Sequence, residues 1–94
     1  MTELLTRHLT IRGRVQGVGF RNYVAYKAGE LGVCGWVRNR IDGSVEAVVQ
    51  GTPAAVASII ECAHRGPRAA EVSGVVVREE PSGDYTAFET HATV

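Results

Sequence analysis

Hydrophobic residues follow two different periods in the first third of the chain. In the segment HLTIRGRV, residues 8–15, they alternate with polar residues, which predicts a strand. The buried side of this strand is expected to carry Leu9, Ile11 and Val15. In the segment FRNYVAYKAGEL, residues 20–31, they recur every three to four positions, which predicts an amphipathic helix that ends at Gly32.

The middle of the chain has the pattern of a hairpin followed by a second helix. Two short apolar segments, 34–40 and 44–51, are separated by the turn signal Asp42-Gly43. Thr52-Pro53 then supplies a helix cap and a first helical residue, and Gly66-Pro67 ends the helix. The apolar stripe of this helix is expected to consist of Val56, Ile59, Ile60 and Ala63.

Two extended segments complete the pattern. Residues 71–80 predict a further strand, and the tail over 85–94 is able to pair as a last one. The order βαββαβ predicts an α+β, ferredoxin-like sandwich, in which an antiparallel sheet carries two helices on one face. We expect residues 1–94 to form a single domain, because the chain contains no linker, internal repeat or low-complexity segment.

Composition narrows the choice of partners. Ten basic residues balance ten acidic ones, which argues against a general binder of nucleic acid or of anionic membranes. No segment is apolar enough for a membrane span or a secretory signal, so we expect a cytoplasmic monomer. Cys34 and Cys62 stand alone, which favours reduced thiols over a disulfide or a metal site.

The segment GRVQGVGFR, residues 13–21, concentrates three glycines between the first strand and the first helix. Backbone amides of a glycine-rich loop and the unpaired amides of a helix start favour a bound anion. Arg21 would lie in the first helical turn, where the helix dipole disfavours a cation. A negative ligand would compensate for that placement.

Several known anion-binding loops do not fit this segment. The P-loop pattern is absent, and the third glycine of a dinucleotide fingerprint is replaced by Asn22. Val15 stands where a cysteine-dependent phosphatase would have its nucleophile. An RNA-recognition signature matches in part, but Val18 replaces an aromatic residue and the segment precedes a helix instead of lying on the third strand.

A second polar position lies in the segment GWVRNRIDGSVEAVVQG, residues 35–51. Asn39 falls near the end of its strand, where an asparagine often bonds to nearby backbone, so this residue alone leaves its role open. Arg38 and Arg40 alternate with Asn39 and should project from the opposite face of the strand. We expect both arginines to be solvated charges, with contact between Arg40 and a substrate near the turn as the alternative.

Together the two segments resemble the motifs of the acylphosphatase family. The first matches as Gly13-x-Val15-Gln16-Gly17-Val18-Gly19-Phe20-Arg21-x-x-Val24. The second matches as Gly35-Trp36-Val37-Arg38-Asn39-x-x-x-Gly43-x-Val45. The likeness extends over nearly the whole chain, although the tail FETHATV departs from the Arg-Tyr end of many members.

This resemblance implies hydrolysis of the carboxyl-phosphate bond of small-molecule acyl phosphates, with no metal or organic cofactor. It implies that Arg21 binds the phosphoryl group and that Asn39 orients the attacking water. The backbone cradle for the phosphoryl group would consist of Gln16, Gly17, Val18, Gly19 and Phe20. A non-catalytic ferredoxin-like module that binds an anion or RNA is the alternative. Related domains also occur inside larger carbamoyl-transfer proteins, which makes carbamoyl phosphate a candidate substrate.

Overall fold

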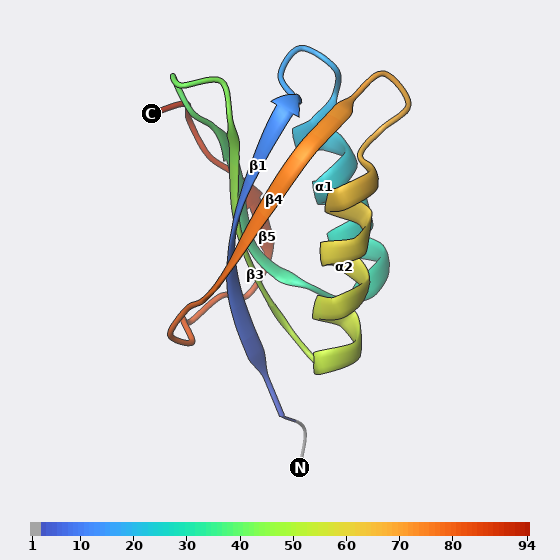
Figure 1. Ribbon diagram of the computed structural model, residues 1–94. Helices are drawn as coiled ribbons and strands as arrows, with labels where there is room; N and C mark the ends of the chain where they lie inside the picture. The colour runs from blue at the N-terminus through green and yellow to red at the C-terminus, as the bar shows by residue number, and fades with distance from the viewer. Residues whose placement is uncertain (1–2) are drawn as a thin grey trace.

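A five-stranded sheet with both helices on one face makes up the fold (Figure 1). The computed structural model describes residues 3–94, so residues 1 and 2 of the expected 1–94 domain lie outside the described residues. The elements in chain order are β1 (Leu5–Arg14), α1 (Phe20–Leu31), β2 (Cys34–Asn39), β3 (Val45–Gly51), α2 (Pro53–Arg65), β4 (Glu71–Glu79) and β5 (Phe88–Thr90). The predicted order of strands and helices is therefore confirmed. The first strand begins three residues earlier than its alternating pattern indicated.

The strand order is β4-β1-β3-β2-β5. The four longer strands pair antiparallel, as predicted, but β5 pairs parallel with β2, with Gly35 opposite Phe88. The sheet is thus mixed and not wholly antiparallel. The reason is that β4 ends at the end of the sheet where β2 begins. The chain crosses to the far edge there and then runs in the same direction as β2.

The tail beyond β5 continues along the edge of β2. The amide of His91 donates to the carbonyl of Val37 at 2.9 Å, and the amide of Val94 donates to the carbonyl of Asn39 at 3.3 Å. The carbonyl of Val94 in turn accepts from the amide of Ile41 at 2.7 Å. The tail therefore flanks β2 up to the turn that follows it.

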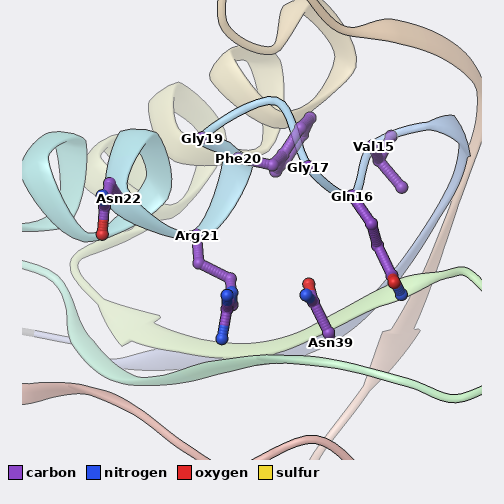
Figure 2. Close-up of a pocket in the computed structure, with 8 residues that line it drawn as sticks. All are labelled: Val15, Gln16, Gly17, Gly19, Phe20, Arg21, Asn22 and Asn39. Carbon is purple, nitrogen blue, oxygen red and sulfur yellow. The ribbon is translucent and has the colours of Figure 1, made fainter.

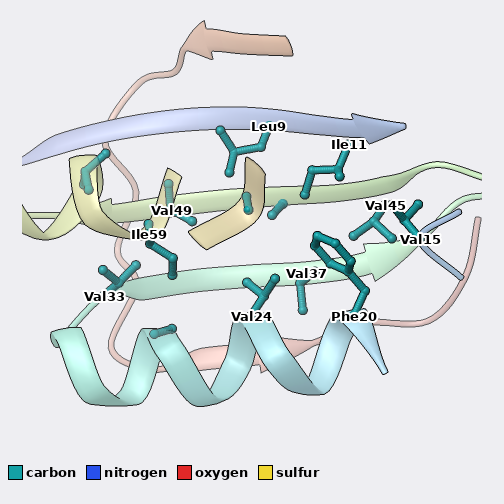
Figure 3. Packing of buried hydrophobic residues seen from close by; sticks show 14 residues of the cluster. Leu9, Ile11, Val15, Phe20, Val24, Val33, Val37, Val45, Val49 and Ile59 are labelled. Carbon is teal, nitrogen blue, oxygen red and sulfur yellow. The ribbon is translucent and has the colours of Figure 1, made fainter. Parts of the chain in front are cut away.

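The core lies between the sheet and the two helices (Figure 3). The inward residues of the first strand and the helical stripes face each other there. Almost fully buried are Leu9, Ile11, Val15, Phe20, Val24, Ala28, Val56, Ile59 and Ala63. Ile60, the remaining residue of the predicted stripe of α2, is half-buried against this core. The Thr52 side chain accepts from the amide of Ala55, which confirms the predicted cap of α2. No helix within residues 3–94 is long and apolar enough to cross a membrane.

Candidate active site

The loop between β1 and α1 is held at both ends by the core. Val15 and Phe20 are each buried, and the residues between them arch over the end of the sheet. Gly17 and Gly19 have φ angles of 74° and 79°, in the left-handed region that side chains with a Cβ rarely adopt. Gly19 also caps α1 without any side-chain hydrogen bond. The loop thus leaves backbone amides at the helix start available to a ligand.

Beneath this loop lies a cavity of about 100 Å³ (Figure 2). It is lined by Val15, Gln16, Gly17, Gly19, Phe20, Arg21, Asn22 and Asn39. Pockets that take a drug-sized ligand measure about 300–1,000 Å³, so this one suits a small group. The structure thus brings together the residues singled out in the two sequence segments, except Val18. The Val18 side chain is half-buried against the edge of the core.

The side chains of Arg21 and Asn39 extend into the space beneath the loop from different elements (Figure 2). Arg21 is the second residue of α1, and the first turn of that helix contains no acidic residue. No carboxylate within residues 3–94 forms an ion pair with Arg21. The helix dipole and the guanidinium therefore both add positive potential to the cavity, which favours an anion there.

Asn39 reaches the cavity because it ends β2 on the face that carries the helices. It pairs in register with Val45, a fully buried residue of the core on the neighbouring strand. The flanking residues Arg38 and Arg40 project from the other face, as the alternation predicts. There they bond to the Glu46 carboxylate, with Arg38 Nε at 2.7 Å and Arg40 Nη1 at 3.0 Å. The expectation that both arginines are solvated charges is therefore wrong.

Gln16 contributes more than a backbone amide to the loop. Its Nε2 donates to the carbonyl oxygens of Arg40, at 2.7 Å, and of Ser44, at 2.8 Å. The turn that contains these carbonyls is closed by Asp42, whose Oδ1 accepts from the hydroxyl and the amide of Ser44. These hydrogen bonds lower the pKa of Asp42. The Gln16 side chain thus joins the loop to the turn after β2, a role the sequence did not reveal.

Two features of the lining bear on its chemistry. Asn22 lines the cavity from the first turn of α1. It is not among the site residues predicted from the sequence, although its position directly after Arg21 could have indicated this. The described residues that line the cavity include no histidine, cysteine, aspartate or glutamate. Within residues 3–94, no three side chains of those types are grouped to hold a metal ion.

Comparison with known proteins settles the family. The family model described as Acylphosphatase matches residues 7–90. The chain belongs to the acylphosphatase family. An acylphosphatase of Acidovorax sp. (strain JS42) is 51% identical, over 96% of this chain and 93% of the relative. The family resemblance of the two sequence segments is thereby confirmed.

Solved structures of an acylphosphatase and of a larger protein share the fold. The acylphosphatase of Coxiella burnetii has a TM-score of 0.90 and 39% identity, over 94% of this chain and 93% of that one. Full-length HypF in its phosphate- and nucleotide-bound form has a TM-score of 0.91 and 26% identity, over 99% of this chain but 12% of HypF. The predicted ferredoxin-like fold is confirmed. As an acylphosphatase, the chain is a hydrolase that cleaves acyl phosphates to a carboxylate and inorganic phosphate.

Proposed function

We propose that Arg21 and the loop amides bind the phosphoryl group of the acyl phosphate while Asn39 orients the attacking water. One observation carries this assignment: Arg21 and Asn39 line one small cavity at the N-terminus of α1. Membership of the family establishes the reaction, and this cavity contains the residue types that the reaction needs. The cradle amides are those of residues 16–20.

Arg21 is suited to the phosphoryl group by its shape as well as its charge. A planar guanidinium donates two parallel hydrogen bonds to two phosphoryl oxygens, which a lysine ammonium cannot do. The backbone amides of the loop can donate further hydrogen bonds to the phosphoryl oxygens, and no side chain has to be ordered for them to do so. In phosphoryl transfer, this positioning and charge stabilisation supply most of the catalysis.

Asn39 orients water and does not activate it as a base. Its carboxamide oxygen accepts a hydrogen bond from the water, but a neutral carboxamide does not take up a proton. The proton of the water passes to a phosphoryl oxygen of the substrate as the phosphorus–oxygen bond to water forms. The bond to the acyl oxygen breaks, and its electron pair leaves with the carboxylate.

The leaving group explains why so few side chains are needed. The conjugate acid of a carboxylate has a pKa of about 4 to 5, so the acyl group departs as an anion without a general acid. An alkyl phosphate would need a proton donor, and the cavity lining offers no carboxyl, imidazole or thiol group for that purpose. The proposed site therefore selects activated phosphates, including carbamoyl phosphate, and works without a metal or an organic cofactor.

Hydrolysis of benzoyl phosphate in the presence of EDTA tests the assignment. We expect the wild-type protein to keep its turnover in EDTA and the Arg21→Ala variant to lose turnover. Arg65 is an exposed arginine of α2, so Arg65→Ala serves as the matched control and should keep wild-type turnover. Loss of wild-type turnover in EDTA would contradict metal independence. A folded Arg21→Ala protein with normal turnover would remove Arg21 from the mechanism. Binding of phosphate without hydrolysis would favour the non-catalytic module.

We also propose that the protein is a cytoplasmic monomer of one domain that binds no nucleic acid. The formal net charge of zero supports the last point, because a nucleic-acid surface needs an excess of basic residues. Sedimentation of the protein alone and with RNA tests both the monomeric state and the absence of RNA binding. A faster-sedimenting species with RNA would contradict the proposal.

A further inference from the structure

Glu46 lies on the face of the sheet that the helices leave uncovered. It is part of β3, directly opposite Arg38 of β2 and Thr10 of β1 in the strand register. Only 8% of its surface is exposed. Three basic side chains surround its carboxylate: Arg38 Nε at 2.7 Å, Arg40 Nη1 at 3.0 Å and His8 Nε2 at 2.7 Å. One carboxylate therefore connects three strands.

These contacts keep the carboxylate charged despite its burial. Burial by itself would raise the pKa of Glu46, but the hydrogen bonds from His8, Arg38 and Arg40 outweigh it and lower the pKa to about 2. The carboxylate is buried, whereas its three partners are partly exposed. A buried carboxylate loses its hydration and recovers hydrogen bonds only when its partners are correctly placed, so it favours one geometry of these side chains.

The geometry in question is that of the end of β2. Arg38 and Arg40 are the immediate neighbours of Asn39, and both side chains are held on the uncovered face by one carboxylate. Because successive side chains of a strand point to opposite faces, holding both neighbours fixes the direction of the residue between them. Asn39 is the last residue of β2 in the register with β3, and the backbone at this point is held by hydrogen bonds from Arg40 to Ser44 and from Val94 to Asn39. The direction of its side chain is set in addition by its two neighbours.

Arg40 also connects this network to the phosphate loop. Its side chain bonds to Glu46, and its carbonyl oxygen accepts from Gln16 Nε2 at 2.7 Å. Arg40 thus contacts Glu46 with its side chain and Gln16 with its backbone. Glu46 is connected to the loop through Arg40, and to Asn39 through the two residues that flank it. It does not itself line the cavity.

We propose that Glu46 is a positioning residue for hydrolysis: it holds Arg38 and Arg40 on the uncovered face and thereby fixes Asn39 in the cavity on the opposite face. This inference rests on the proposed role of Asn39. The Glu46 carboxylate does not contact the substrate. It acts on the water-orienting step. The loop keeps its own contact, because Gln16 bonds to the backbone carbonyl of Arg40 and not to its side chain.

Replacement of Glu46 by glutamine tests the proposal, because it removes the charge and keeps the size. We expect Glu46→Gln to lower kcat for benzoyl phosphate about 10- to 100-fold, since small misplacement of a reacting group has effects of that order. Competitive inhibition by inorganic phosphate should change less than about twofold, because Arg21 is unchanged and Gln16 still bonds to the backbone carbonyl of Arg40. Glu61→Gln, which removes an exposed carboxylate paired with Arg65 on α2, is the matched control and should keep wild-type kcat.

A double-mutant cycle separates positioning from a general loss of structure. If Glu46 acts through Asn39, Glu46→Gln should lower kcat no further once Asn39 is alanine. An equal loss of kcat in both backgrounds, or a normal kcat in folded Glu46→Gln, would overturn the proposal. Arg38→Leu breaks one contact of the network and should give a smaller loss of the same kind. It replaces Glu46→Gln in the cycle should that variant fail to fold.

The same measurements distinguish this inference from the function on which it rests. A normal kcat for Asn39→Ala would overturn the water-orienting role itself, and the positioning role of Glu46 with it. An impaired Asn39→Ala protein together with a normal Glu46→Gln protein would overturn the positioning role alone.

Discussion

The Gln16 side chain donates to the Arg40 carbonyl at 2.7 Å, across 24 positions of the chain. This hydrogen bond and its partner at Ser44 join the phosphate loop to the turn that follows β2. The loop between β1 and α1 and the strand that carries Asn39 are therefore one connected structure. Loss of the Gln16 contacts is expected to affect both.

Gln16→Glu should separate the loop from the turn. A carboxylate cannot donate, so both hydrogen bonds to the carbonyl oxygens would be lost, at a cost of about 0.5–1.5 kcal/mol each in unfolding free energy. Each carbonyl keeps one backbone partner, the amide of Gly43 or of Arg40. We also expect weaker inhibition by inorganic phosphate, because the loop loses its support. Urea unfolding and phosphate inhibition measure the two effects. Unchanged values for both would contradict the structural role of this side chain.

Arg21→Lys should leave the protein folded and lower kcat/KM about 100-fold. Lysine keeps the positive charge but loses the paired donors that fit two phosphoryl oxygens. The initial rate with benzoyl phosphate measures the loss, with Arg65→Lys of α2 as the control that retains full activity. A lysine variant within about twofold of wild type would mean that charge alone suffices.

The turnover of the wild-type protein should vary little between about pH 5 and 7.5. The described residues that line the cavity include no carboxyl, imidazole or thiol group, and the proposed proton transfer goes to the substrate. A pH profile of kcat at saturating benzoyl phosphate checks this. A steep limb near pH 6.5, the ordinary pKa of histidine, would indicate a general base outside the lining.

Acid should destabilise the protein partly through Glu46. The pKa of this carboxyl is lowered from 4.5 to about 2 by folding, so its contribution is fully present above about pH 4.5 and is lost as the pH falls towards 2. The shift corresponds to at most about 3 kcal/mol, which screening of the partly exposed arginines reduces to about 1–2 kcal/mol. Unfolding free energy measured from pH 6 to pH 2 should fall less steeply in Glu46→Gln. Parallel curves for the two proteins would contradict the depressed pKa.

The sequence predicted the helices and the core because these depend on local spacing. Phe20 and Val24 recur at the helical period, and the structure buries both. The two segments that line the cavity were also found from the sequence, since the glycines fix a loop conformation and the strand–turn pattern places Asn39 at a strand end. The glycine spacing indicated the loop by itself, whereas Asn39 was assigned to the site only through the resemblance to the family motifs.

What the sequence did not reveal depends on long-range pairing. Glu46 meets His8 and Arg38 only through the strand register, which no local period encodes. The parallel direction of β5 follows from where β4 ends, and the alternation of a strand is the same in either direction. The hydrogen bonds of the Gln16 side chain likewise required the relative position of two loops.

The C-terminal tail, which consists of β5 and the residues on either side of it, 87–94, has a consequence for contacts between molecules. Without it, β2 would be the outer strand and would present a row of free amides and carbonyls to any extended chain. The tail takes up this row from Gly35 to Ile41, and β5 itself is a strand of only three residues. Foreign strands are thereby kept from adding to the sheet beside Asn39. Residues 87–94 thus protect the strand beside the cavity from pairing with other molecules.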